Sequence, residues 1–383
     1  DQACTAPVDY EKHYVFGNAD IYAKYGKYEE KTTAKINEFE VYNNNGFAAD
    51  ISDVVSSGTI LSATLGGETL DTANLSIENG ILTMPKAEMT QFGEKQLILT
   101  VESANGDRTK VTAPILYITK KIATIADMNA MGTYAKQAAG ENGGSRYDGY
   151  FILTADLDFE SDRSKYTSEI SNAQGNAFYG TIDGRGHKLL NLTITIKGTY
   201  GWNMYFIGKL GNGATVKNLG FINAQCENAK ENSGDTFFTS SSGCGLYTIE
   251  NIYMEITIGA SWGRYAFGAS AENGLKAKNV VVNMKNSADS VLSCLTANMC
   301  VNEGYLQGVY FISASSNSKL GGSYKWKGGA DAGESNAPKD PKIAALYASV
   351  EAMKAANNDY SEFEKSGYWT IVDGLPVFGA AQS

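Results

Sequence analysis

Short runs of alternating apolar and polar residues, separated by turn dipeptides, extend along residues 35–120. The runs at 75–77 and 81–84, for example, flank Asn79-Gly80. The same arrangement recurs at Gly66-Gly67 and at Asn105-Gly106. Asn-Gly and Gly-Gly between alternating runs are typical of β-hairpins, because type I′ turns need a positive φ at both central residues. Several short strands with frequent turns predict a β-sandwich.

The predicted sandwich has no Cys…Trp…Cys pattern, so it resembles a bacterial Ig-like module and not an antibody-type domain.

A self-similar unit recurs later in the chain, where an asparagine precedes an aliphatic residue and a β-rich stretch follows. These asparagines are Asn191, Asn218, Asn251 and Asn279, and Gly308 takes the equivalent place in a fifth copy. One such unit cannot bury its apolar face alone, so the copies are expected to stack as parallel coils. We expect the four asparagines to form one column at a bend, where each buried amide hydrogen-bonds to its neighbours.

Two segments have helical spacing and lie where the ends of a coil stack would need covering. Residues 125–138 follow Thr124, a good N-cap with Asp127 three positions later. Residues 343–356 are the second segment, and 360–378 follow it. Because a β-helix exposes strand edges and apolar core at its ends, we expect these segments to cap the first and the last coil.

Two stretches carry a family resemblance. Residues 178–188 read FYGTIDGRGHK after the strand-like 150–158, and residues 369–378 read WTIVDGLPVF. These stretches resemble the entry and the end of the right-handed β-helix in bacterial cell-surface proteins with GLUG-type repeats, over about residues 120–383 of this chain. An Ig-like domain in front fits the same surface proteins, so the resemblance implies an extracellular or cell-surface location.

The predicted fold class is therefore all-β, with an Ig-like β-sandwich followed by a right-handed parallel β-helix with helical caps. The sandwich is expected over 32–120 and the β-helix with its two caps over 121–383. Residues 1–31 have no clean period and receive no assignment.

Charge and composition limit the possible partners. The formal net charge is −10, and only 19% of the residues are charged. An acidic chain repels phosphate backbones, which disfavours nucleic acid. No apolar run is long enough to span a bilayer, so we expect no membrane insertion. No cofactor motif is present.

Five cysteines, Cys4, Cys226, Cys244, Cys294 and Cys300, have no metal-site or redox-motif spacing. Most are expected to be thiols packed as small apolar groups, although a Cys294–Cys300 bridge is an alternative.

Polar residues suggest two sites, each with a plainer interpretation. Asp183, Arg185 and His187 alternate in a glycine-rich turn, where a base and cations could serve a polysaccharide lyase. The same turn is explained by strand reversal alone, which we favour. Four carboxylates also alternate, namely Asp156, Asp158, Glu160 and Asp162. They could collect calcium, but one solvated strand face is the favoured interpretation, and we predict no metal site.

Aromatic residues give the preferred binding site. Trp202 and Tyr205 lie in one repeat, and Trp262 and Tyr265 lie in the equivalent place of another. Stacked coils could bring the four into one exposed cluster that packs against sugars, although large aromatics also fill bends. The sequence therefore favours a non-catalytic extracellular surface protein of adhesin type that binds a polysaccharide or another host or extracellular polymer. The alternative is a β-helix polysaccharide lyase or glycoside hydrolase.

Overall fold

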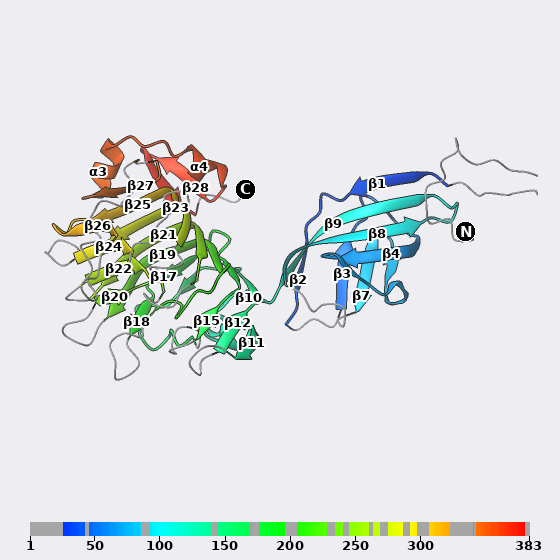
Figure 1. The fold of residues 1–383 in the computed structure, drawn as a ribbon, viewed down its shortest axis with the longest axis horizontal. Helices are drawn as coiled ribbons and strands as arrows, with labels where there is room; N and C mark the ends of the chain where they lie inside the picture. The colour runs from blue at the N-terminus through cyan, green and yellow to red at the C-terminus, as the bar shows by residue number, and fades with distance from the viewer. Residues whose placement is uncertain are drawn as a thin grey trace, which may run out of the picture. The chain divides into compact units, whose positions relative to one another are not determined.

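The computed structural model (Figure 1) describes residues 26–42, 46–85, 92–139, 145–168, 170, 176–195, 205–227, 234–239, 245–259, 263–268, 275–285, 292–296, 306–321, 340 and 342–379. The chain divides into two compact units. The first comprises residues 1–35, 48–84 and 96–114, and the second comprises 36–47, 85–95 and 115–383.

The N-terminal part of the chain forms two small sheets. The larger sheet has the order β1-β9-β8-β4-β5, with β2 also on β9, and the smaller has the order β3-β7-β6. The strands are β1 (Tyr28–Thr32), β2 (Asn37–Glu40), β3 (Gly46–Asp50), β4 (Thr59–Leu65), β5 (Glu68–Thr69), β6 (Ser76–Glu78), β7 (Ile81–Pro85), β8 (Gly93–Glu102) and β9 (Arg108–Ile118). A short 3-10 helix, Thr72–Asn74, precedes β6.

The turn predictions at Asn79-Gly80 and at Gly66-Gly67 are confirmed, whereas at Asn105-Gly106 only Gly106 has a positive φ. β6 and β7 pair antiparallel around Asn79 and Gly80, whose φ angles are 51° and 76°. β4 and β5 likewise pair antiparallel around Gly66 and Gly67, both with positive φ. Two sheets and the hairpins are thus present, while their assignment to the Ig-like class stays a prediction.

The larger unit is built on a parallel β-helix, as predicted. Its main path has the order β10-β13-β16-β19-β21-β23-β25-β27, and every pairing along this path is parallel. These strands are β10 (Lys120–Ile122), β13 (Tyr150–Leu153), β16 (Thr181–Asp183), β19 (Thr215–Glu227), β21 (Tyr247–Ile258), β23 (Leu275–Met284), β25 (Leu306–Ser313) and β27 (Ala344–Tyr347). Figure 1 shows the later strands of this path lying side by side.

Shorter strands complete the coils. A second parallel sheet contains β20 (Gly234–Thr236), β22 (Gly263–Phe267), β24 (Leu292–Thr296) and β26 (Ser318–Gly321). The first coils also contain β11 (Lys136–Ala139), β12 (Ser145–Asp148), β14 (Leu157–Asp158), β15 (Ala177–Phe178), β17 (Lys188–Leu190) and β18 (Thr193–Thr195).

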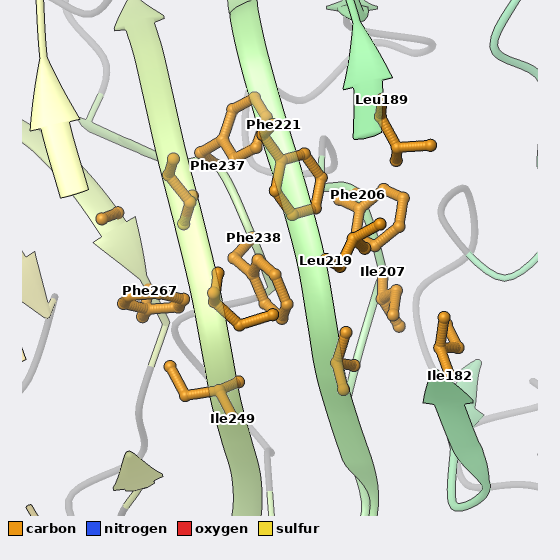
Figure 2. Close-up of a cluster of buried hydrophobic side chains, with 14 of the residues drawn as sticks. Ile182, Leu189, Phe206, Ile207, Leu219, Phe221, Phe237, Phe238, Ile249 and Phe267 are labelled. Carbon is orange, nitrogen blue, oxygen red and sulfur yellow. The ribbon is translucent and has the colours of Figure 1, made fainter. Parts of the chain in front are cut away.

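Aromatic side chains fill the interior of the β-helix (Figure 2). Phe206 and Phe221 meet edge to face with ring centroids 5.0 Å apart, and Phe238 and Phe267 lie 5.1 Å apart. All four belong to one continuous buried cluster. Each coil therefore contributes apolar side chains to a core that no coil could form alone.

The described residues contain two asparagine columns, not the single one that was predicted. Asn218 donates Nδ2 to Asp183, Asn251 donates to Asn218, and Asn279 donates to Asn251, at 2.8, 2.8 and 3.0 Å. The predicted place of Asn191 in this column is wrong, because Asn191 donates to Asp158 at the next bend and accepts from Asn223. The asparagines of both columns have φ between 50° and 57°, a left-handed conformation that asparagine tolerates better than most residues.

The N-terminal cap is shorter than predicted but covers the expected place. It consists of α1 (Ile125–Asn129) and α2 (Met131–Tyr134), after which 136–139 is strand. Thr124 accepts a hydrogen bond from the Asp127 amide, as its sequence context predicted. Met128 and Met131 are buried in the same cluster as the β-helix core.

The C-terminal segment differs from the predicted cap. Residues 344–347 are strand β27, because pairing with β25 overrides their helical propensity. The remaining elements are α3 (Val350–Ala355), α4 (Ser361–Lys365), β28 (Trp369–Val372) and β29 (Leu375–Phe378). These elements form a separate apolar cluster with Val281, Tyr310 and Ile312, on the side of the main sheet opposite its core.

Candidate functional site

A polar face runs along the outer side of the main sheet, before the bend at the asparagines. Ile182, Val216 and Ile249 of successive strands lie in the buried core. Side chains alternate between the two sides of a strand, so the residues next to them point outward. These outward residues form two columns, which we call together the ladder face.

The first column of the ladder face is built of threonines. Thr181 pairs in register with Thr215, and Thr215 pairs with Thr248. Lys276 continues the column on β23. All three threonines are half-buried and Lys276 is exposed. Neighbouring strands lie about 4.8 Å apart, so the three hydroxyl groups repeat regularly over about 10 Å.

The second column alternates in charge. Asp183, Lys217, Glu250 and Lys278 follow one another in register on four successive strands. Gln307 ends the column on β25. Opposite charges on neighbouring strands stabilise the pairing of those strands.

Ionic contacts hold this second column in place. The Nζ atom of Lys217 lies 3.7 Å from an oxygen of Asp183, and that of Lys278 lies 3.8 Å from Glu362 of α4. Burial disfavours the charged form of Lys217, but Asp183 and Tyr150 favour it, and the net effect raises the pKa of this lysine. Lys217 therefore stays charged at neutral pH.

Asp183 lies at one end of the ladder face and is 6% exposed. It accepts hydrogen bonds from the Asn218 amide at 2.8 Å and the Arg185 backbone N–H at 3.0 Å. The Tyr150 hydroxyl donates to it at 3.4 Å. Burial is the largest cause that raises the pKa of Tyr150, and the Asp183 charge adds to it. Tyr150 thus remains a protonated phenol, which is a poor general base near neutral pH.

The other members of the predicted polar cluster point to different partners. The Arg185 guanidinium pairs with Glu38. His187 places Nδ1 at 3.1 Å from Asp156, which also accepts from the Lys188 backbone N–H at 2.9 Å. Asp183, Arg185 and His187 are therefore near in sequence, but their side chains contact different partners, namely Asn218, Glu38 and Asp156. This agrees with the interpretation of the segment as a structural turn.

The four alternating carboxylates have separate structural roles. Asp156 binds the His187 segment, and Asp158 accepts from Asn191 at 2.9 Å. Glu160 pairs with Lys165, and Asp162 accepts from Ser164. Within the described ranges, no group of three or more His, Cys, Asp or Glu side chains is close enough to hold a metal ion.

The predicted aromatic cluster is only partly within the described residues. Trp202 and Trp262 lie outside them. Tyr205 is half-buried, whereas Tyr265 is 4% exposed and packs with Cys294, which is not the exposed position that the sequence led us to expect. The register also separates the two tyrosines, because Ile207 pairs with Thr239 while Tyr265 pairs with Thr236. Tyr205 therefore falls opposite residue 237, whereas Tyr265 falls opposite residue 236.

Cysteine chemistry offers no site in the described part of the chain. Cys226 and Cys294 are both buried thiols that form no disulfide, so Cys294 is not bridged to Cys300. Burial raises the pKa of the Cys294 thiol to about 12, which makes it a poor nucleophile at neutral pH. Cys4, Cys244 and Cys300 lie outside the described residues.

Sequence reasoning missed the ladder face, although a signal was present. In each coil from β16 to β23, the residues three positions and one position before the bend point outward. Both of these residues are polar in every one of these coils. The polar positions beside the bend are recognisable only once the register is known.

Comparisons with known proteins add little. No family model matches the chain, and no curated protein matches it either. One solved structure is similar, described as a "putative immunoglobulin A1 protease from Bacteroides ovatus". The TM-score is 0.34 at 14% identity, over 67% of this chain and 91% of that one. A likeness at this level says nothing about function. Among the described residues, no helix is both long and apolar enough to cross a bilayer.

Proposed function

We propose that this chain is a non-catalytic, extracellular, cell-surface protein of adhesin type that binds an extended polymer, most simply a glycan, along its ladder face. The observation that carries the proposal is the register of the ladder face. Thr181, Thr215 and Thr248 repeat the same hydroxyl group on successive strands. A repetitive polymer presents the same polar group at regular intervals, so it can meet such a column several times at once. Several weak contacts made together give a useful affinity.

Charge on the ladder face supports a polar and nearly neutral ligand. Lys217 and Lys278 alternate with Asp183 and Glu250, and Lys276 adds one positive charge. A strongly anionic polymer would meet two carboxylates in this column, and a strongly cationic one would meet the lysines. Hydroxyl-rich chains avoid both penalties, because they donate and accept hydrogen bonds without charge.

The chemistry of the site favours binding over polysaccharide cleavage. A lyase needs a base and cations that are available to the acid group of the substrate. Tyr150 has a raised pKa, Lys217 lies near Asp183, and Arg185 pairs with Glu38. Tyr150, Lys217 and Arg185 are thus each in contact with a partner within the protein.

A polymer screen with two readouts tests this proposal. The purified chain is incubated with neutral glycans and with uronic-acid polymers, and both retention on immobilised polymer and release of unsaturated or reducing sugar ends are measured. Saturable retention of a neutral glycan without new ends is expected. Release of new ends from any polymer would establish the enzymatic alternative, and no retention on any polymer would contradict the proposal.

A further inference from the structure

A long parallel seam joins the N-terminal strands to β9. In its first half, Tyr28–Thr32 pairs residue for residue with Arg108–Thr112. In its second half, Asn37–Glu40 pairs with Ile115–Ile118. Both halves are parallel to the same strand, β9.

Backbone hydrogen bonds extend the seam beyond the strands. At its beginning, the Arg108 N–H donates to the Lys27 carbonyl at 2.7 Å. Between the halves, the Thr33 N–H donates to the Thr112 carbonyl at 3.0 Å. At its end, the Tyr42 N–H donates to the Thr119 carbonyl at 3.1 Å. The pairing therefore reaches from Lys27 to Thr33 and resumes from Asn37 to Tyr42.

Charged side chains also cross the seam. Lys110 lies 3.2 Å from Glu30 in the first half, and Lys120 lies 2.8 Å from Glu40 just past the second. The Lys27 N–H donates to the Asp107 carboxylate at 2.6 Å. Ion pairs that solvent reaches are individually weak, so the backbone pairing supplies most of the strength of the seam.

The direction of the strands determines how the seam bears a load. The chain enters the seam at Lys27 and leaves it at Thr119, directly before β10 and the β-helix. Because the paired strands are parallel, these two points lie at opposite ends of the seam. Tension between them slides the strands along each other and loads the hydrogen bonds within each half together. In an antiparallel hairpin such as β28–β29 the two chain ends lie at the same end, so tension opens one pair at a time.

We infer that the seam formed by β1, β2 and β9 is a mechanical clamp. It resists tension that passes along the chain from the residues before β1 to the β-helix. This inference does not depend on the proposed polymer binding, because it rests on backbone pairing alone.

Single-molecule pulling with two attachment points tests the clamp. One handle is attached at the N-terminus, and the other is attached through an azide-bearing residue at an exposed alanine. With the second handle at Ala123, just past β10, tension shears the seam. With it at Ala104, in the turn before β9, tension peels the same seam from its Lys27 end. Thermal melting verifies that both variants are folded like the original protein.

The rupture force of the seam is expected to be several times higher in the Ala123 geometry than in the Ala104 geometry at the same pulling speed. Forced rupture reports the barrier to unfolding, so the comparison is of barriers and not of equilibrium stability. Equal forces in the two geometries, or a lower force for Ala123, would overturn the inference.

Discussion

Asn218 donates its side-chain Nδ2 to Asp183 Oδ1 at 2.8 Å, which makes an aspartate the first member of a column of asparagines. The second column begins in the same way, with Asn191 donating to Asp158 at 2.9 Å. In each column every amide donates toward the earlier coil. The first coil therefore needs only an acceptor, and a carboxylate is an acceptor without a competing donor.

The first column ends at Gly308, where the geometry leaves no room for another asparagine. A Cβ atom at Gly308 would lie 2.9 Å from Phe363 of α4. The Asn279 Nδ2 donates to the Glu362 carbonyl at 3.0 Å in addition to Asn251, and the Asn279 Oδ1 accepts no hydrogen bond from any described residue. The column thus stops where the C-terminal segment packs against the sheet.

Replacing Asn251 in the middle of the buried column is expected to destabilise the protein strongly. Asn251→Ala removes its hydrogen bond to Asn218 and the one it accepts from Asn279. Leaving buried partners unsatisfied costs about 1–3 kcal/mol each. Asn223→Ala is the matched control, because Asn223 has the same left-handed backbone but is exposed. Calorimetric melting should show a much larger loss for Asn251→Ala, and equal losses would mean that the buried column contributes little.

The contact of the C-terminal segment with Gly308 predicts a difference in stability between two matched glycine variants. Gly308→Ala must displace Phe363 in addition to adopting a positive φ of 63°. Gly213→Ala also requires a positive φ, of 82°, but a Cβ there meets nothing within 4 Å. Overpacking costs about 1–3 kcal/mol, so Gly308→Ala should be the less stable variant by about that amount. Indistinguishable melting temperatures would contradict the described contact.

Thiol labelling tests the burial of the two described cysteines. Cys226 and Cys294 should resist alkylation in the native protein and react at once after denaturation, because the thiolate is the reactive form and Cys294 has a raised pKa of about 12. Mass spectrometry of peptides after timed alkylation measures this. Rapid native labelling of Cys294, or a disulfide to Cys300, would refute the assignment.

Alkaline pH should destabilise the β-helix through Tyr310, which is buried, and Tyr253, which is half-buried. Burial raises the pKa of Tyr253 to about 12, and it also raises the pKa of Tyr310. An unfolded tyrosine titrates near pH 10, so the neutral phenol contributes stability that is complete below about pH 10 and is lost as the pH rises through the folded pKa. Melting temperatures between pH 8 and about 12 should fall only above about pH 10. Constant stability over this range would contradict the burial of these phenols.

The sequence predicted the repeating parts of this fold better than its exceptions. Stacked coils follow from the repeated asparagine and its aliphatic neighbour, and the Thr124 N-cap follows from a local capping rule. The prediction that Asn191 belongs to the first column was wrong. The first acceptor of that column is Asp183, which a search for asparagine alone does not find. Residues 344–347 were expected to be helical because of their local propensity. They pair with β25 instead, and local propensity cannot anticipate this partner.

The candidate site depended on information that the sequence does not contain. Tyr265 was expected on the surface from its place in the repeat, but burial depends on what covers the strand. The ladder face became visible only through the register that pairs Thr181 with Thr215 and Thr215 with Thr248. Register is set by contacts between residues far apart in the chain, which a single repeat does not specify.

Polymer retention by ladder-face variants tests the central claim most directly. Thr215→Val and Thr248→Val, made together, remove two hydroxyl groups from the column while keeping the side-chain shape. The matched control is Thr257→Val, which changes another half-buried threonine of β21 at the far side of the bend. Melting temperatures of all variants ensure that the comparison is made on folded protein.

We measure the dissociation constant for the glycan that the screen selects, by calorimetry or by retention on immobilised polymer. The account predicts that the double variant binds at least tenfold more weakly, which corresponds to about 1.4 kcal/mol, while Thr257→Val binds like the original protein. Unchanged binding by the folded double variant would contradict the assignment of polymer binding to the ladder face.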